Sequence, residues 1–231
     1  MRISVLVSVL LLASASAASS AELLSNGSFE LPALGGTAYD YPGNPDLVTA
    51  NPNNYPATVN DWTYGGSAIV NTSVGANAWY GGAAPAGYDA IQFAALQAGS
   101  SLSQIFNSGA AGLGNLSWLS GGRPDLNSVG GNQSYNVFLN GNLLGTYFTT
   151  DGQAFTLESF ANASLLAGSN TLNFVGLSTA DGKRIYIGSP GATKEVAAFL
   201  PTLKVGQTYT FPDAFLDFQK SRRSSPKYQG N

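Results

Sequence analysis

Few residue types in this chain could do acid–base, nucleophilic or metal chemistry, because its 231 residues include no His, no Cys and 13 Asp and Glu. Without His there is no Ser-His-Asp triad, no HExxH zinc site and no imidazole base near neutral pH. Without Cys there is no thiolate nucleophile and no disulfide. A glycosidase with a pair of carboxylates is the enzyme class left open. The acids available for it are Asp61, Asp89, Asp125, Asp151 and Glu158. No motif fixes two of them at a catalytic separation, so we do not expect an enzyme.

Aromatic residues in a turn-rich segment indicate ligand binding instead. Trp79 and Tyr80 lie in the Gly- and Ala-rich stretch "ANAWYGGAAPAGYDA" (76–90). Flat aromatic faces can pack on the C–H surfaces of sugar rings, while polar groups around them fix the orientation. We therefore take Trp79 and Tyr80 as candidate ligand-binding residues, with burial in the core as the alternative for Trp79. Trp62 begins a strand and Trp118 alternates within one, so we expect both in the core.

Arg123 is the third candidate ligand-binding residue. It is the only base between Glu22 and Gly182, a stretch that holds ten acids. It lies in the turn "GGRPD", where it could hydrogen-bond a ligand or form an exposed pair of little energetic consequence with Asp125. The acidic balance of this stretch repels phosphates, so we expect no nucleic-acid partner.

The charge balance reverses at Lys183, because the residues from there to Asn231 include eight bases and three acids. The strand pattern ends at Gly188, and Pro190 lacks the N–H that a further ladder bond needs. We therefore predict that residues 189–231 form an atypical basic tail that is poorly ordered and does not pack on the preceding domain. A basic tail on an acidic domain and a frameshifted or recombined ending both explain the change.

The first 21 residues have the features of a secretory signal peptide. Arg2 gives a positive start, an apolar run follows, and small residues offer cleavage sites at "ASA" (15–17) or "SSA" (19–21). The apolar run is too short for a transmembrane helix. We predict an extracellular or cell-surface protein with no membrane span in the mature chain.

Short strands are the elements that must position these residues. Tyr135, Val137 and Leu139 alternate with polar residues, a pattern typical of an antiparallel sheet with one solvated face. Asn140-Gly141 predicts a two-residue hairpin turn, since both residues tolerate positive φ. Residues 32–60 are rich in Pro, Asn and Gly and are predicted as a long surface loop. We expect strands at 23–30, 68–72, 90–94, 101–106, 115–120, 134–140, 142–149, 154–161, 171–177 and 184–188. The sequence thus predicts an all-β fold, an antiparallel β-sandwich over residues 22–188.

The series of motifs resembles the galactose-binding-domain-like jelly rolls of secreted bacterial proteins, which include carbohydrate-binding modules and surface proteins with a PEP-CTERM sorting tail. The matching pieces are "LLSNGSFELP" (23–32), "DWTYGG" (61–66), "AIQF" (90–93), "SLSQIF" (101–106), "LSWLSGGRP" (116–124), "YNVFLNGNLLGTY" (135–147) and "TLNFVGL" (171–177). They span about two thirds of the chain in the same order. The sorting tail is missing, because no PEP motif and no apolar helix end the chain.

The resemblance implies a structural calcium ion near Glu30, because the acid after the opening Phe often helps to hold one in this family. Calcium prefers such hard oxygen ligands. The family's last strand often supplies a further Asp, whereas "RIYIGSPG" (184–191) has Gly188 and Ser189 at the corresponding positions. The resemblance also implies a secreted, non-catalytic module that binds a polysaccharide or a cell-surface glycan. The alternatives are a structural or adhesive extracellular matrix protein without a discrete sugar site, and a carboxylate-pair glycosidase.

Overall fold

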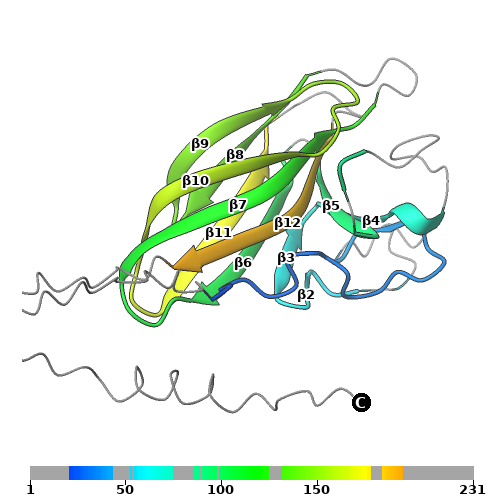
Figure 1. Ribbon diagram of the computed structural model, residues 1–231. Helices are drawn as coiled ribbons and strands as arrows, with labels where there is room; N and C mark the ends of the chain where they lie inside the picture. The colour runs from blue at the N-terminus through cyan, green and yellow to red at the C-terminus, as the bar shows by residue number, and fades with distance from the viewer. Residues whose placement is uncertain are drawn as a thin grey trace, which may run out of the picture. The chain divides into compact units, whose positions relative to one another are not determined.

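Two six-stranded sheets, A and B, face each other in the computed structural model (Figure 1). The structure describes residues 21–43, 53, 55–74, 86–88, 90–97, 99–124, 132–177 and 184–194. These residues contain no α-helix and one 3-10 turn, η1 (Thr72–Val74), and hence no helix that could cross a membrane. All pairs of neighbouring strands are antiparallel. The predicted antiparallel β-sandwich is confirmed.

The chain crosses from one sheet to the other at most of its connections. Sheet A consists, in order across the sheet, of β1 (Tyr39–Asp40), β4 (Ala68–Asn71), β5 (Gln92–Leu96), β12 (Ile185–Lys194), β7 (Gly112–Gly122) and β10 (Thr156–Leu165). Sheet B consists of β2 (Thr58–Val59), β3 (Trp62–Gly65), β6 (Ser101–Asn107), β11 (Ser169–Gly176), β8 (Gln133–Leu139) and β9 (Asn142–Thr149). Strands that are distant in the sequence, such as β8 and β11, are therefore direct neighbours.

The main core fills the space between the sheets. In β8 the side chains of Tyr135, Val137 and Leu139 are buried there, while the residues between them are half-buried on the other face. Trp62 of β3 and Trp118 of β7 are fully buried in this core, as the sequence predicts. Trp118 Nε1 donates to the Tyr135 hydroxyl at 2.8 Å, so the polar atoms of the two rings satisfy each other. Burial raises the pKa of Tyr135.

A second apolar cluster lies on the opposite face of sheet A. The rings of Phe93 (β5) and Tyr186 (β12) belong to it and are 4.6 Å apart. Phe155 packs on Phe93 at 5.4 Å, and Tyr88 stacks on Phe155 at 4.7 Å. Consequently β4, β5 and the first half of β12 are buried on both faces, which explains why their sequences do not alternate. The outer face of sheet B instead keeps polar side chains partly exposed.

The predicted strand at 23–30 is wrong, although Phe29 enters the main core as expected. Asn26 and Phe29 adopt φ values of 46° and 59°, which a regular strand without a bulge does not contain, so the chain turns here. Among the described residues before β1, Glu22 makes an isolated bridge to Thr193 of β12. Phe29 N donates to Asn26 O at 3.1 Å within this turn, and side chains of distant strands, such as Gln104 and Trp62, bind Ser25 and Asn26.

The hairpin between β8 and β9 forms where the sequence predicts it. Asn140 and Gly141 both have positive φ, 53° and 77°, as a two-residue turn of this type requires. The following strand, β9, has the predicted bounds of 142–149. The predicted loop 32–60 is wrong in part, because β1 and β2 lie within it and pair with β4 and β3.

The predicted end of the sandwich at Gly188 is also wrong, because β12 continues to Lys194. The register of β12 against β7 shifts between Gly188 and Gly191, and Ser189 has a φ of 44°. Pro190 therefore lies within a bulge, where its missing N–H interrupts no ladder bond. Residues 195–231 lie outside the described residues, and the basic tail there stays a prediction.

Candidate functional site

Trp79 and Tyr80 lie outside the described residues, so their role in ligand binding stays a prediction. The structure describes both flanks of their segment. Val74 ends η1, and the Ala86 carbonyl oxygen accepts a hydrogen bond from Phe155 N at 2.8 Å. Ala86, the first described residue after the segment, therefore lies beside the aromatic cluster of sheet A.

Arg123 is only 7% exposed and follows directly after β7. Its backbone N donates to Arg184 O at 3.1 Å, and its carbonyl oxygen accepts from Gly152 N at 3.2 Å. Burial raises the pKa of Tyr41, and the positive charges of Arg184 and Arg123 oppose that rise, so both lie near this ring. The alternative of an exposed pair with Asp125 is wrong in that Arg123 is buried, while the pairing itself stays untested because Asp125 lies outside the described residues. Ligand binding by Arg123 stays a prediction.

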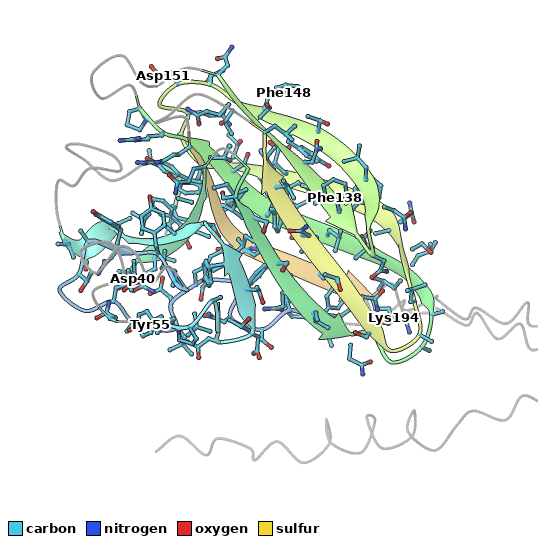
Figure 2. The ribbon with its side chains drawn as sticks, turned by 180° about the vertical axis from the view of Figure 1, so that it is seen from behind. Asp40, Tyr55, Phe138, Phe148, Asp151 and Lys194 are labelled. Atoms are coloured by element: carbon cyan, nitrogen blue, oxygen red, sulfur yellow. The ribbon has the colours of Figure 1, made fainter. Side chains whose placement is uncertain are left out.

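An open hollow of about 570 Å³ lies on the outer face of sheet B, over β8 and β11. Its volume falls within the range of about 300–1,000 Å³ that small-molecule sites occupy. Figure 2 shows Phe138 over the middle of this sheet and Phe148 toward one end. The residues that line the hollow are Phe138, Asn140, Gly141, Thr171, Asn173 and Val175, none of which is ionisable.

The alternation of β11 brings the polar residues of the hollow onto one face. Leu172 and Phe174 are fully buried in the main core, so Thr171 and Asn173 point outward. The register of β11 against β8 then sets Asn173 directly opposite Phe138. A polar side chain and an aromatic ring from two distant segments thus become immediate neighbours.

The β8–β9 turn fixes one end of the hollow. Asn140 Oδ1 accepts a hydrogen bond from Thr171 N at 2.8 Å, and Asn140 N donates to Thr171 O at 2.9 Å. Asn140 Nδ2 donates to Asn170 Oδ1 at 2.9 Å. Since the Asn140 amide is occupied by these bonds, the Thr171 hydroxyl and the Asn173 amide are the groups left to meet a ligand.

Asn173 carries an unsatisfied polar atom at this site. Its Oδ1 is buried and has no hydrogen-bond partner among the residues that the structure describes. A buried acceptor without a hydrogen bond lowers the stability of the folded state by about 1–3 kcal/mol unless another group donates to it. Phe138 beside it is half-buried, so part of its ring faces the solvent. The pair can offer a flat apolar surface and a hydrogen-bonding amide to one uncharged ligand.

Three of the five acids considered for catalysis are described, and they lie on separate elements. Asp61 is exposed in the turn between β2 and β3, and Asp151 is exposed after β9. Glu158 lies in β10, where its Oε1 accepts a hydrogen bond from the Ser120 hydroxyl at 3.1 Å. The other two acids lie outside the described residues. Within the described ranges, no three His, Cys, Asp or Glu side chains gather as they would around a metal ion.

Glu30 does not fit the expected calcium site. Its Oε1 accepts hydrogen bonds from Ile91 N and Gln92 N, both at 2.8 Å. The carbonyl oxygens of the neighbouring residues Phe29 and Pro32 accept hydrogen bonds from Gln92 Nε2 at 2.6 and 3.0 Å. N–H donors thus occupy the oxygens that calcium would need. The structure assigns Glu30 to backbone capping at the start of β5.

Phe138 and Asn173 were not predicted as binding residues, because they lie in strands rather than in a turn-rich segment. One signal was present in the sequence. The residues of "SYNVFLN" that share parity with Phe138 are Ser134, Asn136 and Asn140, so an aromatic ring stands on the polar face of that strand. The opposing Asn173 could not be found this way, because its position depends on the pairing of β8 with β11.

No family model matches this sequence, and no curated protein matches it either. A solved cyclase from Fischerella sp. TAU is similar with a TM-score of 0.50 at 12% identity, over 77% of this chain and 98% of the cyclase. A family 61 carbohydrate-binding module in complex with β-1,4-galactotriose has a TM-score of 0.46 at 14% identity, over 76% of this chain and 100% of the module. A family 36 module in complex with calcium and xylotriose has a TM-score of 0.35 at 16% identity, over 55% and 98%.

At such identities the cyclase match concerns the fold alone, and it agrees with the β-sandwich described above. The resemblance to PEP-CTERM surface proteins stays a prediction from the motifs.

Proposed function

We propose that this chain is a secreted, non-catalytic carbohydrate-binding module whose ligand lies in the hollow on the outer face of sheet B. One observation carries the proposal: Asn173 Oδ1 is buried without a partner among the described residues, directly opposite the half-buried ring of Phe138. A folded protein tolerates such an atom most readily where a ligand supplies the missing bond. The series of jelly-roll motifs and the signal-like residues 1–21 support the same proposal from the sequence.

The chemistry of the hollow suits a sugar ring. The Phe138 ring can pack on the C–H face of a pyranose, as aromatic side chains do in polar ligand sites. A small rotation of the Asn173 side chain brings its amide oxygen to a sugar hydroxyl, which removes the cost of the unpaired atom. The Thr171 hydroxyl can donate to or accept from a second hydroxyl. An uncharged lining favours neutral over acidic sugars.

A polymer can continue from the hollow across the sheet. The residues in register with Phe138 and Asn173 are Ser103 of β6 and Thr63 of β3. Neighbouring strands lie about 4.8 Å apart, so this polar row extends the hollow by roughly 10 Å at right angles to the strands. A neutral linear glycan lying along this row is the ligand class that we propose.

Retention on soluble polysaccharides in native gels tests the proposal. We expect the wild-type chain to be retarded by a neutral glycan, with β-1,4-galactan and xylan as first probes, and not by polygalacturonate. Phe138→Ala removes the proposed platform and should weaken retention at least about tenfold, the effect of losing roughly 1.4 kcal/mol. Phe148→Ala is the matched control, since Phe148 is 68% exposed on the same face and does not line the hollow.

Two results would contradict the proposal in different ways. If no neutral glycan retards the chain, carbohydrate binding itself is wrong and the structural or adhesive alternative gains support. If retention survives Phe138→Ala but is lost in Trp79→Ala, the sugar platform is the predicted one at Trp79 and Tyr80. Cleavage of a glycan during the experiment would favour the glycosidase alternative.

A further inference from the structure

The segment Ser25–Leu34 is held in place by side chains from distant strands rather than by a β-ladder. Gln104 of β6 accepts from Ser25 N and donates to Ser25 O, both at 2.9 Å. Trp62 Nε1 donates to Ser25 O at 3.2 Å and to Asn26 O at 3.1 Å. The first half of the segment therefore docks on sheet B through neutral N–H donors.

Gln92 holds the second half of the segment in the same manner. Its side-chain oxygen accepts from Leu34 N at 2.7 Å, and its Nε2 donates to Phe29 O at 2.6 Å and Pro32 O at 3.0 Å. These partners fix the orientation of the amide, because a backbone N–H can only donate and a carbonyl oxygen can only accept. Gln92 is 2% exposed, so the arrangement is closed to solvent.

The environment of Gln92 Nε2 resembles that of a cation. Two carbonyl oxygens converge on the nitrogen, Phe29 O at the upper end of the 2.3–2.6 Å range of calcium–oxygen bonds and Pro32 O beyond it at 3.0 Å. Glu30, from the same segment, binds the backbone N of Gln92 at 2.8 Å. The Tyr88 hydroxyl lies within hydrogen-bonding distance of both Gln92 O and Ser28 O and shares its one proton between them, which ties the neighbouring turn to the same residue.

We propose that the Gln92 amide takes the place of a metal ion in docking residues 29–34, and that the position becomes a cation site when the amide is exchanged for a shorter carboxylate. In Gln92→Asp the side chain loses one methylene, so it leaves space at the former Nε2 position. It also adds a negative charge, and the carboxylate with the Phe29 and Pro32 carbonyl oxygens supplies up to four of the six to eight oxygen ligands of a calcium ion, whose shell water would complete. The wild-type chain, in contrast, gains nothing from calcium.

Thermal unfolding of three proteins with and without calcium tests this inference. The melting temperature of the wild-type chain should not change with millimolar calcium or with a chelator. Gln92→Asp and its neutral isostere Gln92→Asn should both melt roughly 5–15 °C lower in chelator, because both lose buried hydrogen bonds. Calcium should restore at least half of the loss in Gln92→Asp and none of it in Gln92→Asn, since binding to the native state alone stabilises it.

A fall in the wild-type melting temperature on addition of chelator would overturn the inference, because a metal would then already be present. An equal calcium response of the Asp and Asn variants would overturn it as well. If Gln92→Asp does not fold in chelator, refolding is compared with and without calcium. Calcium-dependent refolding of Gln92→Asp but not of Gln92→Asn would support the inference, and no difference between the two variants would overturn it. The outcome is independent of glycan retention, so it stands or falls separately from the proposed function.

Discussion

Asn173 is the residue at which stability and the proposed function oppose each other. Its buried Oδ1 has no partner among the described residues, so the unliganded protein bears the cost of a desolvated amide. Asn173→Leu has a similar size and removes that cost. We expect the variant to melt about 2–4 °C higher, which corresponds to a gain near 1 kcal/mol, while glycan retention falls. Thermal melts and retention gels on the same preparation measure both effects.

Asn136 supplies the matched control for this prediction. It lies on the same face of sheet B, but its Oδ1 already accepts a hydrogen bond from the Thr146 hydroxyl at 2.7 Å. Asn136→Leu should therefore bring no comparable gain in melting temperature. If Asn173→Leu is destabilised, the amide oxygen is not an unpaired group in solution, and the observation that supports the sugar site is lost.

Asp40 makes the stability of the fold depend on pH. The side chain is fully buried; Asn53 N and Asn53 Nδ2 donate to its Oδ2 at 3.2 and 2.9 Å, and its Oδ1 has no partner among the described residues. Burial raises the pKa of Asp40 above its usual 3.8, and the bonds from Asn53 oppose the rise. The folded state thus binds the proton more tightly than the unfolded state. This contribution to stability is present at low pH and is lost as the pH rises through the raised pKa.

Asp40→Asn should reveal that dependence. The variant keeps the shape of the side chain and carries no charge at any pH. The quantity to compare is the melting temperature of the variant minus that of wild type. We expect this difference to be more positive at about pH 7 than at about pH 4, because only the wild type must bury a carboxylate at the higher pH. A difference that does not change between these two pH values, or that changes in the opposite direction, would show that the carboxylate is solvated in the folded state.

At the scale of elements, the strands that could be predicted well are those with one solvated face and a local turn signal. The bounds of β9 and the turn at Asn140-Gly141 followed from local sequence. The segment 23–30 could not be predicted, because its backbone partners are the side chains of Gln92 and Gln104, which no local pattern connects to it. An apolar run with an Asn-Gly pair therefore looked like a strand.

The end of the last strand, β12, was predicted wrongly for a related reason. The sequence "IYIGSPG" contains a Pro, and Pro ends a regular strand. A bulge at Ser189 and Pro190 lets β12 resume, so that Gly191–Lys194 pair with β7. Ala192 also fastens the start of the described chain, since its N donates to Glu22 Oε1 at 2.7 Å and its carbonyl oxygen accepts from Leu23 N at 2.7 Å.

Two truncations test the importance of this second half of β12. Removal of residues after Lys194 should leave the melting temperature nearly unchanged, in agreement with the predicted basic tail. Removal of residues after Gly188 takes away half of a central strand and should prevent cooperative unfolding near the wild-type temperature. Circular dichroism melts of both products measure the difference. Equal stability of the two would mean that β12 effectively ends at Gly188, as the sequence first predicted.

At the scale of the whole molecule, the two sheets present unequal outer faces. The aromatic cluster of Phe93, Phe155 and Tyr186 covers part of sheet A, whereas the outer face of sheet B carries the hollow beside Phe138. Composition excluded imidazole and thiolate chemistry, since His and Cys are absent, and left a carboxylate-pair glycosidase open. The place of the site could not be predicted, because Phe138 and Asn173 become neighbours only through the register of two strands from distant parts of the chain.

The most direct test of the proposed sugar site is a map of the residues that a neutral oligosaccharide perturbs in solution. Nuclear magnetic resonance titration of the isotope-labelled chain, with an oligosaccharide from the glycan that retards it in gels, provides that map. The proposed site predicts saturable shifts at Phe138, Thr171 and Asn173, including the Asn173 side-chain amide, and unchanged signals at Phe155 and Tyr186 on sheet A. Shifts confined to residues 76–90, or no saturable shift on the outer face of sheet B, would contradict it.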